Sequence, residues 1–206
     1  MNRETLGCFC YSKSMIKLII LDIGGVYLKG HAQTFFEQLQ SVANTAIDQT
    51  TFFNHLNTTD NIELSLGHFA PTATDGTTAE LISIWQHTWT IDQEMYQLVQ
   101  NLKPHYTIVA LSNSEKRNSD YYQSQGWYGQ FDATFLSHVT KLYKPNQAAY
   151  QQVISHMGVA PDEAIFIDDT PKNIIGAAAV GIPGILFTSP DECCKQLEKF
   201  GISTYL

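Results

Sequence analysis

The stretch LIILDIGGVYLKG, Leu18–Gly30, decides the fold of this chain. Ile16–Leu21 is a short apolar run rich in β-branched residues, which predicts a strand buried on both faces. The run ends on a single carboxylate, Asp22, and the turn residues Gly24 and Gly25 follow at once. Carboxylates are rarely buried without a partner. Asp22 is therefore either a turn residue that hydrogen-bonds nearby backbone or a nucleophile or metal ligand at the mouth of a parallel sheet.

Strand-like segments recur along the rest of the chain, with helical segments between them. The helices expected over Asn146–Met157 and Pro171–Val180 are followed by Gly158 and Gly181, residues that commonly end helices. This alternation predicts an α/β fold: a three-layer, Rossmann-like parallel sheet core with right-handed crossovers. The four further strands are expected at Tyr106–Leu111, Ala133–Leu136, Ala164–Ile167 and Gly184–Phe187.

A segment of about 60 residues breaks this alternation, because residues 30–92 contain little strand pattern. We expect a small α-helical insertion there, directly after the first strand, with the core at 15–29 and 93–206. The loop Pro71–Thr78 interrupts it. Its helices are expected at Phe35–Ala43, Thr50–Leu56 and Ala79–Trp89, and its aromatic core at Phe35, Phe36, Phe52, Phe53, Trp85 and Trp89.

Composition excludes several classes of function. The formal net charge of −8 argues against general binding to nucleic acids or anionic membranes, both of which require a basic face. No apolar run approaches the length of a membrane span. Residues 1–14 lack the pattern of a secretion signal and are expected to be a loose extension, with Met15 a natural start. The cysteines, none at zinc-site spacing, indicate reduced thiols and a cytoplasmic location; they are Cys8, Cys10, Cys193 and Cys194. The acidic balance is compatible with a monomer, and a dimer through the insertion or the sheet edge is the alternative.

Polar groups follow three further strands. Ser112 and Asn113 follow the second strand, Lys144 follows the third, and Asp168 and Asp169 follow the fourth. Because the carboxyl ends of parallel strands line one crevice, these groups are expected to meet Asp22 there. Clustered carboxylates favour Mg²⁺, while a lysine, a hydroxyl and backbone N–H groups suit a phosphate. Each group also has an ordinary explanation, as a helix cap or a solvated lysine, and it is their order and placement together that favour a site.

At these residues the sequence resembles the haloacid dehalogenase-like (HAD) hydrolase superfamily. The resemblance is carried by LDIGGV, LSNS, KP and FIDDTPKNIIGAAAVG and extends from about Ile16 to the C-terminus. It implies a Mg²⁺-dependent phosphatase in which the insertion is a small cap. The implied nucleophile is Asp22, assisted by Lys144. The implied metal ligands are Asp22, the Gly24 carbonyl, Asp168 and Asp169, the last through water or by orienting Lys144. The implied phosphate-binding residues are Ser112, Asn113, Lys144, Gly24 and Gly25.

The sequence departs from this family at one position. Most of its phosphatases carry a second aspartate, the general acid and base, two residues after the nucleophile, where this chain has Gly24. One explanation is a leaving group that needs little protonation, such as that of a sugar 1-phosphate. A second is a proton donor from elsewhere, such as His31 or His68. A third is a binding or interaction module without catalysis, and dehalogenase-like chemistry is a further alternative within the family.

The expected substrate is a small phosphorylated metabolite, because a small cap encloses small ligands. A sugar phosphate is preferred and a nucleotide is the next choice. The polar residues of the insertion that could contact it are His31, Asn57, Asp60, Glu63 and His68.

Overall fold

The computed structural model describes residues 15–30, 32–42, 46–52, 55, 62–70 and 73–204. Its centre is a five-stranded sheet with the strand order β5-β4-β1-β6-β7, in which every neighbouring pair is parallel. The α/β class and the parallel sheet predicted from the sequence are thereby confirmed. The strands are β1 (Leu18–Leu21), β4 (Thr107–Ser112), β5 (Ala133–Leu136), β6 (Ala164–Asp168) and β7 (Gly184–Leu186).

Helices cover both faces of the sheet. Successive residues of β1 point to opposite faces, as in any strand. Ile19 and Leu21 belong to one buried cluster, and Leu18 and Ile20 to another. The first cluster includes residues of α5 (Gln93–Leu102) and α10 (Pro190–Lys199), and the second includes residues of α8 (Gln147–Met157) and α9 (Pro171–Ala178). The remaining helical segments of the core are α6 (Lys116–Ser124), η1 (Trp127–Gln130), α7 (Ser137–Thr140) and η2 (Pro161–Glu163).

The ends of α8 follow the sequence pattern closely, whereas α9 ends at Ala178, before the predicted end at Val180. Asn146 is the N-cap of α8, and its side chain accepts a hydrogen bond from the Ala148 N–H at 3.0 Å. Gly158 ends the same helix with φ of 67°, a left-handed conformation that glycine adopts without strain. Cys193 and Cys194, on α10, are free thiols. None of the described helices combines the length and apolar character needed to cross a bilayer.

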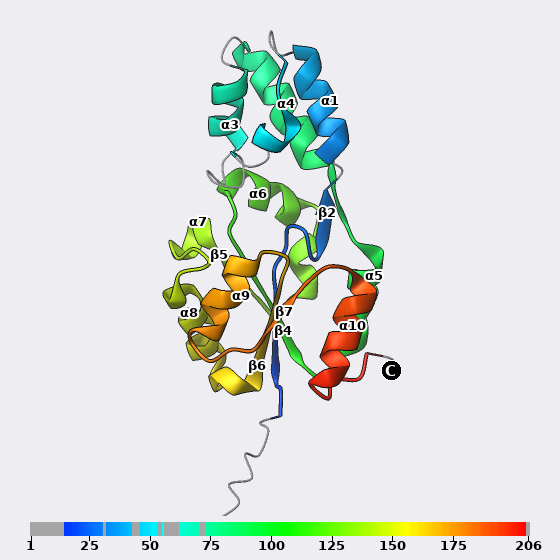
Figure 1. Cartoon of the computed structure of the whole chain (residues 1–206), viewed down its shortest axis with the longest axis vertical. Coiled ribbons are helices and arrows are strands. Elements are labelled where there is room, and N and C mark those ends of the chain that lie inside the picture. The colour runs from blue at the N-terminus through cyan, green and yellow to red at the C-terminus, as the bar shows by residue number, and fades with distance from the viewer. Residues whose placement is uncertain are drawn as a thin grey trace, which may run out of the picture.

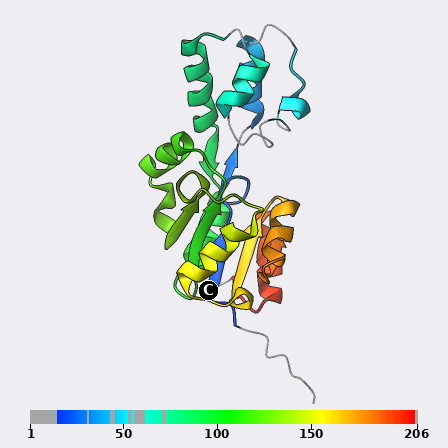
Figure 2. The same ribbon diagram turned by 90° about the vertical axis from the view of Figure 1, so that its left-hand side faces the viewer.

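The predicted helical insertion lies at one end of the long axis of the molecule, beyond the carboxyl ends of the strands (Figures 1 and 2). It contains α1 (Ala32–Val42), α3 (Ile62–Phe69) and α4 (Asp75–His87), and residues 49–52 are also helical. Phe35, Phe36, Phe52 and Trp85 are buried in its own core cluster, as predicted, and Trp89 packs against that cluster. Phe53 and the extension over residues 1–14 lie outside the described residues.

The insertion connects with the core through a feature that the sequence analysis did not predict. Leu28–Gly30 (β2) and Trp89–Ile91 (β3) form a two-stranded antiparallel ribbon where the chain leaves and re-enters the core. The expected helix over Ala79–Trp89 was therefore wrong at its end. Helix α4 stops at His87, and the Thr88 hydroxyl donates to the Trp85 carbonyl at 2.7 Å.

The expected loop over Pro71–Thr78 was also wrong in its second half. Helix α4 already begins at Asp75, because Thr74 is its N-cap and accepts a hydrogen bond from the Thr77 N–H at 3.3 Å. The N-cap and the packing of α4 against α1 and α3 outweigh the low helix propensity of Gly76, at the second position of the helix.

Candidate active site

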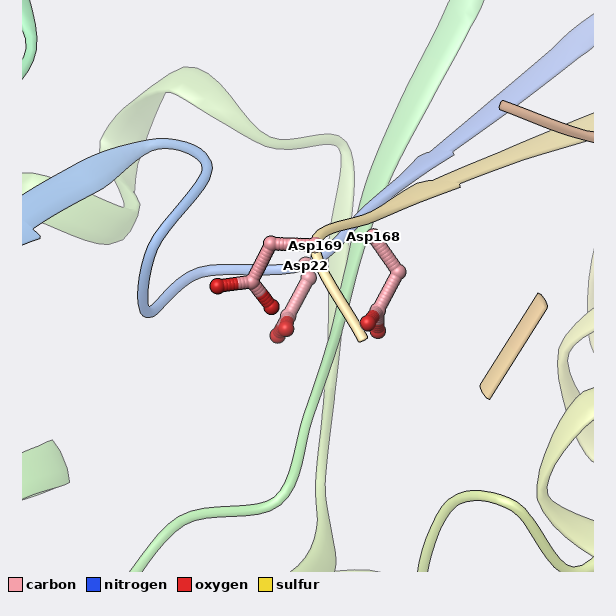
Figure 3. A group of neighbouring side chains, drawn as sticks. All are labelled: Asp22, Asp168 and Asp169. Atoms are coloured by element: carbon pink, nitrogen blue, oxygen red, sulfur yellow. The ribbon is translucent and has the colours of Figure 1, made fainter. Parts of the chain in front are cut away.

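Three carboxylates meet at the carboxyl end of the sheet. Asp22 directly follows β1, and Asp168 and Asp169 stand at the end of β6, the strand paired with β1. The Asp22 N–H donates to the Ile167 carbonyl at 2.9 Å, which continues the ladder as far as the turn after β1. One ligand oxygen from each of the three aspartates lies within 4.8 Å of the other two. Figure 3 shows the three side chains gathered where the two strands end.

Lys144 joins this group from the loop after α7. Its ammonium lies 2.7 Å from Asp22 Oδ1 and 2.7 Å from Asp168 Oδ2, and its side chain is only 2% exposed. Burial pushes the pKa of Lys144 down, but Asp22 and Asp168 outweigh burial and the net shift is upward. The ammonium also lies 5.5 Å from the centre of the Phe166 ring. Lys144 therefore remains charged and neutralises part of the acidic cluster.

Asn113 fixes the position of Lys144. Its amide nitrogen donates to the Lys144 carbonyl at 3.0 Å, and its amide oxygen accepts from the Lys144 N–H at 2.8 Å. Both ends of the side-chain amide thus bond the backbone of this loop, and the phosphate-binding role of Asn113 stays a prediction. Ser112 is buried at the end of β4, and its hydroxyl makes a long 3.4 Å bond to the Asn113 carbonyl.

Asp168 is completely buried and surrounded by donors. Besides Lys144, it accepts bonds from the Thr170 N–H at 2.8 Å and from the Asn173 amide, at 3.0 Å to each carboxylate oxygen. Asp169 instead is exposed and accepts from the Thr170 hydroxyl, at 3.0 Å. Lys144 thus pairs with Asp168 and not with Asp169, which leaves ligation as the remaining predicted role of Asp169. Asn173 was not predicted from the sequence, although its place near the start of the helix after two aspartates could have indicated it.

The two glycines of the turn have different surroundings. Gly25 has φ of +81°, and a Cβ there would overlap the Asp169 carboxylate. Only glycine allows this backbone and carboxylate to approach so closely. A Cβ on Gly24 would meet only the indole of Trp89, at ordinary van der Waals distances of 3.7 and 3.8 Å.

The two carboxylate oxygens of Asp22 differ in their contacts. Its Oδ1 accepts from the Ile23 N–H at 2.7 Å and contacts Lys144, whereas Oδ2 has no hydrogen-bond partner among the described residues. Burial, and to a lesser degree the nearby Asp168 and Asp169, raise the pKa of Asp22 to about 7 despite the opposing effect of Lys144. Burial also raises the pKa of Asp169.

This donor set suits a hard divalent cation. Three carboxylates face one ammonium, which leaves an excess of negative charge. Burial is the main cause of the raised pKa of Asp22, and the charges of Asp168 and Asp169 add to it. The close packing of Asp169 on Gly25 holds its carboxylate beside the turn. All available ligand atoms are oxygens, which favours Mg²⁺ over softer metals.

Of the two candidate proton donors, only His68 lies within the described residues, and no contact brings it to this cluster. His68 is exposed, and its ring stacks on His55 with a centroid separation of 4.7 Å. His31, Asn57 and Asp60 lie outside the described residues, as does the side chain of Glu63. Within the described residues, no contact links His68 with the three aspartates.

Comparison with known proteins identifies the class to which this fold and site belong. The haloacid dehalogenase-like hydrolase family model matches residues 16–181, and the chain therefore belongs to that family and is a hydrolase of the HAD type. Among solved structures, a HAD family enzyme from Bacteroides thetaiotaomicron aligns with a TM-score of 0.68 at 19% identity, covering 85% of this chain and 95% of the other. A HAD phosphatase from Thermococcus onnurineus aligns with a TM-score of 0.66 at 17% identity, covering 92% and 100%.

Curated relatives match over shorter stretches. A chloroplast flavin mononucleotide hydrolase of Arabidopsis thaliana is 39% identical over 70 residues, which cover 34% of this chain and 29% of that protein. A sesquiterpene phosphatase of Aspergillus oryzae is 28% identical over 111 residues, covering 52% and 56%. The matches thus span less than two thirds of the length of these relatives.

Proposed function

We propose that this protein is a Mg²⁺-dependent phosphomonoester hydrolase that acts on a small phosphorylated metabolite through an aspartyl-phosphate on Asp22. The observation that carries the proposal is the buried contact of Lys144 with Asp22 and Asp168 beside a third carboxylate, Asp169. The names of two curated relatives, a flavin mononucleotide hydrolase and a sesquiterpene phosphatase, support phosphate-ester hydrolysis. A Bacteroides thetaiotaomicron structure aligned at a TM-score of 0.66 was solved with magnesium and inorganic phosphate.

In the proposed mechanism, the free Oδ2 of Asp22 attacks phosphorus while Lys144 holds Oδ1 and offers positive charge to the phosphoryl oxygens. Ser112 and the backbone N–H groups that follow it bind other phosphoryl oxygens. The bond from phosphorus to the leaving oxygen breaks, and that oxygen departs with the electron pair. Water then hydrolyses the acyl phosphate and restores Asp22. Mg²⁺, held by Asp22, Asp168, Asp169 and the Gly24 carbonyl, would neutralise charge on the phosphate.

The preferred substrates are sugar phosphates, with sugar 1-phosphates first. Gly24 offers no proton to the leaving oxygen, so esters whose leaving group is stable without early protonation should react fastest. The anomeric hydroxyl of a sugar is more acidic than an ordinary alcohol and meets this condition. The helical insertion, proposed as a cap over residues 30–92, would exclude water and select small esters.

The test is release of inorganic phosphate from a panel of sugar 1-phosphates, sugar 6-phosphates, nucleotides and aryl phosphates with Mg²⁺. We expect hydrolysis that EDTA stops and added Mg²⁺ restores. Asp22→Asn keeps the side-chain shape and should reduce turnover by at least about a thousandfold. Substantial turnover in Asp22→Asn, or equal activity with and without metal, would rule out the proposed mechanism.

A further inference from the structure

The strongest unassigned feature of the molecule is the side chain that stands beside Gly24. Apart from the neighbouring residues of the chain, the only described atoms within 4 Å of a Cβ placed on Gly24 are Trp89 Cη2 and Cζ3, at 3.7 and 3.8 Å. A Cβ on Gly24 would thus fit without a clash, and the edge of an indole lies beside it at ordinary contact distance. In most phosphatases of the family this is where the second aspartate begins, two residues after the nucleophile.

Trp89 is held in this place by packing on both sides of the junction between insertion and core. It pairs with Gly30 across the ribbon, and a Cβ on Gly30 would lie 3.3 Å from three atoms of the indole. Trp85, from the end of α4, packs edge-on against it with a ring separation of 5.4 Å. Trp89 contacts both the core cluster and the cluster of the insertion.

The indole nitrogen does not compensate for the missing acid. The ring edge beside Gly24 carries only carbon atoms, whereas Nε1 belongs to the other ring of the indole. Nε1 is buried and has no hydrogen-bond partner among the described residues. An aromatic edge is weakly positive and tolerates a nearby oxygen, but it supplies no proton and adds apolar surface.

We infer that Trp89 is a specificity-determining residue that forms the apolar wall of the leaving-group subsite. This inference rests on the proposed function, because it takes Asp22 as the group that faces phosphorus. A leaving group with an apolar face directly beyond the ester oxygen, such as the carbon face of a sugar ring or an aryl ring, packs against the indole. Its oxygen leaves as the anion and takes its proton from water. Small polar esters gain no binding free energy from contact with the indole.

Binding of two inert phosphonates tests the wall without requiring turnover. Benzylphosphonate places a ring where the leaving group lies, and methylphosphonate does not. With Mg²⁺ present, calorimetry should show that the unmodified protein binds benzylphosphonate about tenfold tighter, the range expected for burying part of an aromatic ring. Trp89→Ala should abolish this preference for benzylphosphonate. Its affinity for methylphosphonate should stay within about threefold of that of the unmodified protein. Trp89→Phe should restore part of the preference for benzylphosphonate.

The matched control is Trp127→Ala. Trp127 is also partly buried against the core cluster, but it packs on Tyr121 and Tyr122, and it is not among the described atoms beside Gly24. This variant should keep the preference for benzylphosphonate. An unchanged preference in Trp89→Ala, or no binding of either phosphonate to the unmodified protein, would overturn the assignment.

The same experiment separates this inference from the proposed function. If the ester panel shows no hydrolysis but the Trp89-dependent preference is present, the proposed enzyme activity fails and the apolar wall stands. If hydrolysis is present and the preference does not depend on Trp89, only the wall fails. If Trp89→Ala instead disrupted the whole site, the binding of methylphosphonate would weaken as well. Circular dichroism and the Trp89→Phe variant would reveal such a disruption.

Discussion

At the scale of single residues, Lys144 is the side chain on which the charge balance of the site depends. It is buried between Asp22 and Asp168, and both partners lie at 2.7 Å. Removing one member of a buried charged group leaves the others uncompensated, which typically costs about 3–5 kcal/mol. In this site one of the uncompensated groups is Asp22, whose pKa is already raised to about 7, so the loss should depend on whether Asp22 is protonated.

We therefore expect Lys144→Met to lower both turnover and stability. Turnover should fall by about 100-fold or more, since a positive charge on the phosphate is lost. The melting temperature should fall more at pH 8 than at pH 5, because Asp22, with its pKa of about 7, is protonated at pH 5 and charged at pH 8. Lys116→Met is the control, since Lys116 forms an exposed pair with Asp120. An equal loss at both pH values would contradict the proposed charge balance.

Gly24 is the other single residue of importance, because it stands where most phosphatases of the family carry the general acid. In Gly24→Asp we expect a gain of roughly tenfold or more on alkyl phosphates, up to the usual range of about 10²–10⁴ for general acid catalysis. Sugar 1-phosphates should change little, since their leaving groups depend less on protonation. The measurement is kcat/KM on both classes. No change on either class would count against the leaving-group explanation.

At the scale of elements, the turn after β1 and the end of β6 are fitted to each other through Gly25 and Asp169. Gly25→Ala places a side chain at φ of +81° and against the Asp169 carboxylate. The backbone strain should cost about 1–2 kcal/mol. The displacement of Asp169 should in addition weaken Mg²⁺ binding.

Gly126→Ala separates these two effects. Gly126 has φ of +72°, and a Cβ at this position would have no neighbour within 4 Å among the described residues. Denaturant unfolding should show a similar loss of stability in both alanine variants, whereas calorimetry should show weaker Mg²⁺ binding in Gly25→Ala alone. If both variants bind Mg²⁺ normally, Asp169 does not take part in the metal site.

The ribbon of β2 and β3 is the other important element. It joins the insertion to the core, and Lys29 on β2 pairs with Asp92, directly after β3, at 3.4 Å. The insertion also contacts α6, where the Gln86 amide donates to the Arg117 carbonyl at 3.3 Å and His87 packs on Tyr121. These contacts hold the end of α4 against the helix that follows β4, the strand that carries Ser112.

At the scale of the whole molecule, metal binding and pH are coupled through Asp22. Its pKa is raised from 3.8 to about 7 in the metal-free protein. Between these values the folded chain holds a proton that the unfolded chain has released. Asp22 therefore makes the metal-free protein less stable as pH rises through this window, and the loss is complete above about pH 7.

Mg²⁺ must displace the proton on Asp22, so the affinity of the site for Mg²⁺ should fall below pH 7. We expect the Kd to rise by roughly tenfold for each pH unit below about 7 and to level off above it. Calorimetric titrations between about pH 5.5 and 8.5 measure this dependence. Asp22→Asn should bind Mg²⁺ more weakly and show a much shallower pH dependence. A Kd that is flat across the range in the unmodified protein would disprove the coupling.

The sequence alone determined the sheet and the acidic residues at its carboxyl end. Short β-branched runs are buried on both faces in a parallel sheet, so β1, β4, β5, β6 and β7 could be predicted with small errors at their ends. Because parallel strands end at one edge, the convergence of Asp22, Lys144, Asp168 and Asp169 could be predicted as well. These features depend on local pattern and on one topological rule.

Only the tertiary structure decided which partners these residues have. The amide of Asn113 around the Lys144 backbone, the Asn173 bonds to Asp168 and the ring edge of Trp89 beside Gly24 depend on how the folded chain packs. The β2–β3 ribbon was missed for the same reason, since three residues carry too little periodicity to predict a strand, and its pairing depends on where the insertion leaves and returns. Local pattern fixes which residues reach the edge of the sheet, whereas packing fixes what each of them contacts there.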